Sequence, residues 1–119
     1  MRLSEWRASR TARALFWAAA LFAFVMAVLP HPPEVPGHPN DKLQHITAFA
    51  TLALLGSFAY PAAALILLLV RLSLFGAAIE VVQAIPALHR DSDVWDWIAD
   101  TVAVAVVLLI VRWWRARQT

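Results

Sequence analysis

The sequence predicts an all-α, polytopic membrane protein with four transmembrane helices and both termini in the cytoplasm. Two observations carry this prediction. The chain has 119 residues and is 61% hydrophobic, whereas soluble domains are closer to half apolar. Seven of its ten lysines and arginines lie within the first 13 or the last eight residues. Basic segments beside apolar spans mark the cytoplasmic side of a membrane.

The first apolar segment, at about 14–30, is expected to form a membrane helix. A membrane helix needs about 20 mostly apolar residues, with about 17 as the lower limit. The proline-rich stretch PHPPEVPGHP then ends it, because proline cannot continue a helix interior. A cleaved signal peptide is the alternative, since it also has a basic start and an apolar middle. The stretch MAVLPHPP offers no small-x-small cleavage site, so we expect the segment to remain as an anchor.

Three further helices are expected at about 42–60, 62–85 and 95–113. Pro61 should open the helix at 62–85, because proline suits the first helical turn. Residues 14–113 would then form a single membrane domain between two basic cytoplasmic tails, 1–13 and 114–119. An even number of spans agrees with two termini on the same side. The loops after the first and third helices are therefore expected on the non-cytoplasmic side.

Polar residues gather at the non-cytoplasmic ends of these helices. Residues three or four apart share one face of a helix, and three such pairs occur here. With a rise of about 1.5 Å per residue, they fall in one layer roughly 10 Å thick. Polar groups at such depth normally face the bundle interior and pair with one another. The candidate site comprises Asp41, Lys42, His45, Glu80, Gln83, Arg90, Asp93, Asp96 and Asp100.

Helix capping is the alternative role for several of these acids. Asp41 would cap the second helix, and Asp93 or Asp96 would cap the fourth, because carboxylates favour helix N-termini. Capping does not explain Glu80, which lies near a helix C-terminus where the dipole opposes a carboxylate. Arg71 lies near the middle of the third helix. It would extend toward the membrane surface or bond to backbone carbonyls, and we assign it no role.

Three segments, DKLQH, EVVQ and RDSDVWDWIAD, resemble the motifs of the VanZ-like membrane proteins over about residues 38–110. That family's pattern runs Asp-Lys-x-x-His, then Glu-x-x-Gln, then Arg, an Asp six residues later and an Asn four after that. Asp100 stands where the family usually has Asn, which adds an ionisable group. Ala103 stands where the family usually has Gly, which loosens a close helix contact.

The resemblance implies a multi-pass protein of the bacterial inner (cytoplasmic) membrane, with its polar site at the positions matched here. The family takes its name from a glycopeptide-resistance accessory protein linked to reduced teicoplanin susceptibility. On this basis the expected function is binding of an envelope precursor, a lipid headgroup or a glycopeptide-type ligand at an outward-facing polar site. Lys42 and Arg90 would contact phosphate, since bidentate geometry favours arginine there.

Two other functions remain open. The protein would be a membrane-embedded enzyme acting on an envelope lipid if His45 and a carboxyl group such as Glu80 exchanged protons with it. Alternatively, a divalent cation such as Mg²⁺ or Mn²⁺ would bind His45, Glu80, Asp96 and Asp100, a set rich in oxygen ligands. Without that cation, no cofactor is expected. As a purely structural scaffold, the protein would use these polar residues only to lock the helices together. Each polar contact between membrane helices would then stabilise the bundle by about 0.6 kcal/mol.

The composition narrows the remaining classes of partner and chemistry. The chain has no cysteine, which excludes disulfides, thiolate metal sites and cysteine nucleophiles. The positive charge flanks apolar spans rather than forming one basic face, so a nucleic-acid partner is not expected. The expected partners are the lipid bilayer, an envelope lipid and, in a homo-oligomer, further copies of the chain.

Overall fold

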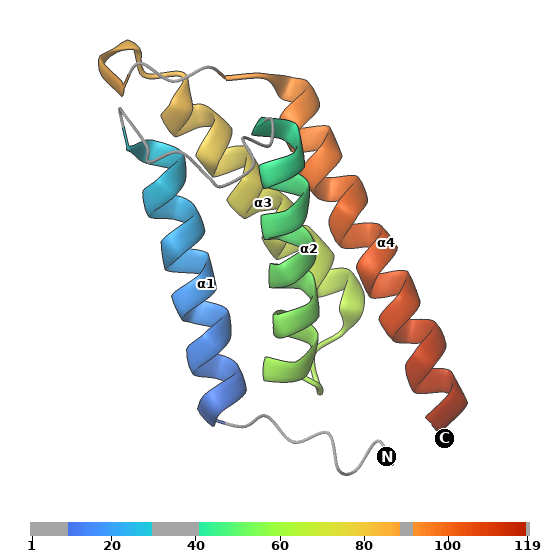
Figure 1. The fold of residues 1–119 in the computed structure, drawn as a ribbon. Helices are drawn as coiled ribbons and strands as arrows, with labels where there is room; N and C mark the ends of the chain where they lie inside the picture. The colour runs from blue at the N-terminus through green and yellow to red at the C-terminus, as the bar shows by residue number, and fades with distance from the viewer. Residues whose placement is uncertain (1–9, 30–40, 89–91, 119) are drawn as a thin grey trace.

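The protein folds as four antiparallel α-helices arranged up-down-up-down, and Figure 1 shows the bundle. The computed structural model describes residues 10–29, 41–88 and 92–118. A short 3-10 helix, η2, lies between the third and fourth helices. The elements are α1 (Arg10–Val28), α2 (Asp41–Ala59), α3 (Leu65–Gln83), η2 (Pro86–Leu88) and α4 (Val94–Gln118). The described residues confirm the predicted all-helical architecture with four helices, whereas the transmembrane role of α2 stays a prediction.

Helix α2 lies in the middle of the bundle and packs against α1, α3 and α4 (Figure 1). The start of α1, the turn between α2 and α3, and the end of α4 lie together at one end. We call this the basic end, because α1 begins and α4 finishes with arginines there. The opposite end, where α2 and α4 begin, is called the polar end. The helix order therefore brings both ends of the bundle's chain to one side, as the predicted topology requires.

Three of the helices, α1, α3 and α4, are long and apolar enough to cross a membrane. A helix of 19 residues, such as α3, is about 28 Å long, close to the roughly 30 Å hydrocarbon core of a bilayer. Helix α2 has the same number of residues, but its first turns are polar and lower its mean hydropathy. Much of α2 is enclosed by its neighbours, with Phe49, Leu52 and Ala53 buried.

The helix bounds differ from the predicted ones where proline or arginine made the pattern ambiguous. Pro61 does not open α3, contrary to the prediction. It lies in a turn closed by the Ala63 amide, which donates to the Tyr60 carbonyl at 3.0 Å. Helix α3 begins after Ala64, whose backbone is extended. Helix α4 continues through Gln118, so most of the predicted basic tail at 114–119 is helical.

The buried face of α4 changes from polar to apolar along its length. Its buried residues recur every three or four positions, so they lie on one side of the helix. The first two are carboxylic acids and the remaining three are aliphatic: Asp96, Asp100, Val104, Leu108 and Val111. The buried face of α3 changes in the complementary direction, because it ends in Glu80 and Gln83. A polar layer therefore covers the apolar core at the polar end.

Below this layer, hydrogen bonds join α3 and α4. The Trp97 indole N–H donates to the Ser73 carbonyl at 3.0 Å. The Ser73 and Thr101 hydroxyl oxygens are 2.9 Å apart, and Thr101 donates to the Trp97 carbonyl at 3.0 Å. The one hydroxyl proton of Thr101 is used in that bond, so Ser73 is the donor to Thr101. Such bonds contribute about 0.6 kcal/mol each between membrane helices.

Helix α1 is held against the bundle by a close approach to α2. Phe16 is its buried residue, and it packs over Gly56. A Cβ atom added to Gly56 would lie 3.0 Å from the Phe16 ring, so a larger residue would push α1 away. Next to Phe16, the Trp17 indole donates to the Tyr60 hydroxyl at 2.7 Å. Small residues at such contacts let membrane helices approach closely.

Candidate functional site

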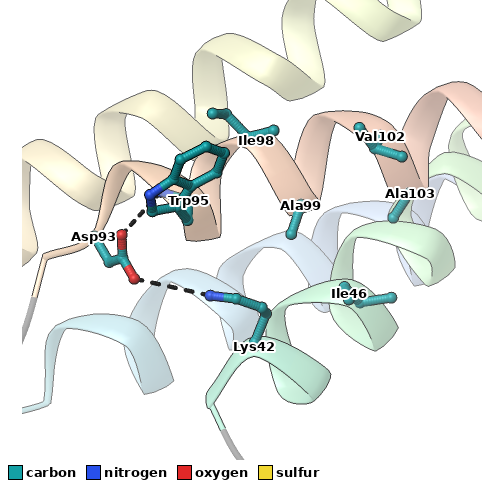
Figure 2. A pocket seen from close by; sticks show the side chains of 8 residues that line it. All are labelled: Lys42, Ile46, Asp93, Trp95, Ile98, Ala99, Val102 and Ala103. Carbon is teal, nitrogen blue, oxygen red and sulfur yellow. Dashed lines mark hydrogen bonds and ion pairs between the residues drawn. The ribbon is translucent and has the colours of Figure 1, made fainter.

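An ion-pair cluster joins α2 to the start of α4 at the polar end. The Lys42 ammonium lies 2.9 Å from Asp96 Oδ1 and 3.8 Å from Asp93 Oδ2. The Asp96 side chain is 11% exposed, whereas those of Lys42 and Asp93 are about half exposed. Asp93 also caps α4, because its Oδ1 accepts the Trp95 amide at 2.9 Å. Figure 2 shows Asp93 between Lys42 and the start of α4. We call Lys42, Asp93 and Asp96 the outer cluster.

A second group of polar side chains lies one helical turn deeper. His45 Nδ1 lies 3.2 Å from Asp100 Oδ2, and a Glu80 carboxylate oxygen completes the group. One ligand atom from each residue lies within 4.8 Å of the other two. His45 follows Lys42 by three residues and Asp100 follows Asp96 by four, which corresponds to a step of about 5 Å into the bundle. We call His45, Glu80 and Asp100 the inner triad; three different helices supply it.

The contacts of Glu80 explain why a carboxylate lies near the end of α3. Its Oε2 accepts the Asp93 amide at 3.0 Å and the Ser92 hydroxyl at 3.2 Å. Ser92 also lies within bonding distance, 2.9 Å, of the Glu80 backbone carbonyl. The carboxylate opposed by the dipole of α3 therefore lies at the N-terminus of α4, where the helix dipole favours a negative charge. Glu80 thus connects the end of α3 to the start of α4.

Several buried oxygens of this layer accept no hydrogen bond from the part of the chain that the structure describes. They are Glu80 Oε1, Gln83 Oε1 and Asp100 Oδ1. Asp100 is completely buried, and Glu80 and Gln83 are 7% and 2% exposed. A buried acceptor without a partner destabilises a fold by about 1–3 kcal/mol, and more when charged. The polar layer therefore contains three buried acceptor oxygens that receive no hydrogen bond from the described residues.

Gln83 has a different position from the rest of the predicted site. Its side-chain amide donates to the Ala27 carbonyl at 3.0 Å, so it ties the end of α3 to the end of α1. Arg90 and the side chain of Asp41 lie outside the described residues. Of the nine predicted site residues, the structure thus brings three into the outer cluster and three into the inner triad, and it places Gln83 at a separate helix contact.

A groove runs between α2 and α4, beginning at the outer cluster. Its upper part has a volume of about 660 Å³, with Lys42 and Asp93 at its mouth and apolar side chains beyond (Figure 2). The lining residues are Lys42, Ile46, Asp93, Trp95, Ile98, Ala99, Val102 and Ala103. A second hollow of about 330 Å³ continues along the same two helices, lined by Ala50, Thr51, Leu54, Val107, Ile110 and Val111. The groove is therefore polar at one end and apolar along its length.

Sequence reasoning missed two residues that shape the site. Ser92 bonds to Glu80, and its place directly before a capping aspartate was the available signal. Gly76 lies beneath the inner triad, where an added Cβ would be 3.4 Å from both Asp100 Oδ2 and the Phe49 ring. A single glycine one turn before Glu80 in an apolar helix is a sign of close approach by a neighbour.

Comparison of the chain with protein-family models, with curated proteins and with solved structures finds no match. The side chains and their geometry are therefore what indicates function. The motif resemblance to the VanZ-like proteins stays a prediction from the sequence.

Proposed function

We propose that this chain is a VanZ-like, multi-pass protein of the bacterial inner membrane that binds an envelope lipid in the groove between α2 and α4. The lipid headgroup would contact the outer cluster, and an acyl chain would follow the apolar part of the groove. One observation carries the proposal: the groove has charged residues only at its mouth, and two apolar hollows follow in series along the same pair of helices.

The length of the groove matches one acyl chain in one leaflet. Lys42 and Leu54 are the first and last α2 residues that line it. They are twelve residues apart, which is about 18 Å along a helix. Half of the hydrocarbon core of a bilayer is about 15 Å thick. The small side chains of Ala99 and Ala103 leave the upper part of the groove open.

The charges at the mouth suit a headgroup that carries both a phosphate and hydroxyl or amino groups. The Lys42 ammonium is about half exposed and has three donors, so it can contact phosphate while bonded to Asp96. The half-exposed Asp93 carboxylate accepts N–H or O–H donors. With both basic helix ends in the cytoplasm, this mouth opens on the envelope side. Arg90, which resembles the family's arginine, is proposed as a second phosphate contact.

A second function, catalysis on the bound headgroup, is favoured by the inner triad. A buried carboxylate that fixes an imidazole is the arrangement that orients a general base. Asp100 contacts His45 in this way, about one turn below the groove mouth. The triad offers no serine or cysteine nucleophile, so a reaction here would use water or a hydroxyl of the lipid.

The lipid proposal is tested by closing the groove and counting the lipids that remain bound. Ala103→Leu would fill the upper hollow, whereas Ala78→Leu adds the same atoms to an exposed position of α3. Native mass spectrometry of the protein, extracted gently from a bacterial membrane, measures the bound lipid. We expect Ala103→Leu to lose most of the phospholipid and Ala78→Leu to retain it.

Equal lipid retention by the two variants would contradict the proposal. A change from dimer to monomer on Ala103→Leu, with lipid retained, would instead identify the groove as a contact between copies of the chain and would also contradict it. Lys42→Gln provides a check on the headgroup, since the preference for phosphate-bearing lipids should fall while total binding of neutral lipid persists.

A further inference from the structure

We infer that the inner triad of His45, Glu80 and Asp100 binds one divalent transition-metal ion, for which Mn²⁺ and Zn²⁺ are the appropriate probes. The site is distinct from the lipid groove, which begins at the outer cluster and has no residue of the triad in its lining. The inference does not depend on lipid binding.

The spacing of the ligand atoms is close to that around a single ion. Two ligands at about 2.1 Å from one ion are separated by about 3.0 Å when adjacent and about 4.2 Å when opposite. His45 Nδ1 and Asp100 Oδ2 lie 3.2 Å apart, which fits adjacent ligands. The full set lies within 4.8 Å, so a contraction of less than about 1 Å would bring the three ligand atoms to the spacing around one ion.

The unused oxygens provide an independent reason to expect an occupant. Asp100 Oδ1 and Glu80 Oε1 accept no hydrogen bond from any described residue, and both side chains are more than nine-tenths buried. Two carboxylates this close in an enclosed space repel unless a proton or a cation lies between them. Hydrogen bonds to Oε2 from the Ser92 hydroxyl and the Asp93 amide hold the Glu80 carboxylate beside His45 and Asp100.

The charges around the triad favour a dication. Lys42 pairs with Asp96, the carboxylate one turn above, so it already has a partner outside the triad. A histidine that binds a metal does so as a neutral imidazole, so the ion would meet two carboxylate charges. These two negative charges match one divalent ion. Imidazole suits Zn²⁺ and other late first-row ions, whereas carboxylates suit Mn²⁺. Three protein ligands leave a coordination position for water, as in catalytic metal sites.

The inference narrows the sequence-based hypothesis of a cation held by four residues. Ligand atoms of His45, Glu80 and Asp100 lie within 4.8 Å of one another, whereas Asp96 Oδ1 is paired with Lys42 at 2.9 Å. Removal of one oxygen ligand shifts the expected ion from Mg²⁺, which requires near-octahedral oxygen coordination, toward Mn²⁺ or Zn²⁺.

The test is direct metal binding to the full chain in detergent, after removal of metal with a chelator. Mn²⁺ or Zn²⁺ alone is added, the protein is separated from free ion by gel filtration, and metal is counted by mass spectrometry. We expect about one ion per chain, and at least tenfold weaker binding for Glu80→Gln and Asp100→Asn. The control is Glu34→Gln, which also removes one carboxylate but lies between α1 and α2 in the sequence and belongs to neither the outer cluster nor the inner triad. It should bind like the wild type.

A spectroscopic measurement keeps the inference falsifiable when a variant does not fold. Mn²⁺ bound to the wild-type protein should show magnetic coupling to one imidazole nitrogen, and His45→Gln should abolish that coupling. Failure of the wild type to retain an ion would overturn the inference, as would wild-type affinity in both carboxylate variants. Neither result changes the number of bound lipids, so failure here is distinguishable from failure of the proposed lipid binding.

Discussion

The hydrogen bond between Ser73 and Thr101 allows a quantitative test of how α3 is fixed to α4. Ser73→Ala removes the donor, while Thr101 keeps its own bond to the Trp97 carbonyl. Thr101→Val removes the acceptor with little change of shape. The Ser73 hydroxyl then has the option of bonding to a carbonyl of its own helix. Each single substitution should therefore destabilise the protein by only about 0.5–1 kcal/mol.

The coupling between the two substitutions isolates the bond itself. Bonds of this kind between membrane helices average about 0.6 kcal/mol, with about 1.7 kcal/mol as the upper limit. At 1.4 kcal/mol per factor of ten, a coupling of about 0.6 kcal/mol is close to a threefold effect on the unfolding equilibrium. The double variant should be less destabilised than the sum of the single variants by that amount.

The assay is reversible unfolding in mixed micelles with an increasing fraction of denaturing detergent, followed by circular dichroism. Thr51→Val serves as the control, because the exposed Thr51 hydroxyl donates at 2.8 Å to the Thr47 carbonyl of the same helix. It should change the unfolding free energy by less than about 0.5 kcal/mol. Strictly additive single effects for Ser73 and Thr101 would refute the interhelical bond.

Two further outcomes follow from the packing and the topology. Gly76→Ala should change stability by less than about 1 kcal/mol in the same assay, because better helix propensity offsets contacts at 3.4 Å with Asp100 and Phe49. Gly76→Leu should destabilise by about 1–3 kcal/mol or more, and equal stability of the two variants would argue against close packing there. The chain has no cysteine, so Val94→Cys should react with a membrane-impermeant maleimide in intact cells, and Arg117→Cys only after lysis. The reverse pattern would refute the predicted orientation.

The number and order of the helices were predictable because apolar length dominates folding in a membrane. Boundaries were less predictable, since they depend on local competition. Pro61 suits both a first helical turn and a tight turn, and the Ala63–Tyr60 hydrogen bond selects the turn. Arg115 and Arg117 suggested a tail, but they lie in the last turn of α4, where cations interact favourably with the helix dipole.

The gathering of polar residues at one end was also predictable, because residues three or four apart share a helix face. Their pairing was not, because it depends on how the helices rotate relative to one another. Lys42 pairs with Asp96, while His45 pairs with Asp100. Helical spacing alone does not determine which residue of α2 pairs with which residue of α4. The bond from Ser92 to Glu80 depends on the path of the loop between α3 and α4. The groove depends on side-chain size along two different helices, which no single segment reveals.

The change from carboxylates to aliphatic residues on the buried face of α4 restricts how this protein can move. Axial sliding of α4 toward the basic end by four residues, about 6 Å, would carry Asp100 to the level now held by Val104. An ionised carboxylate would then lie among aliphatic and aromatic side chains without a partner, which is strongly unfavourable. The change of polarity along the buried face of α4 therefore opposes sliding of this helix toward the basic end.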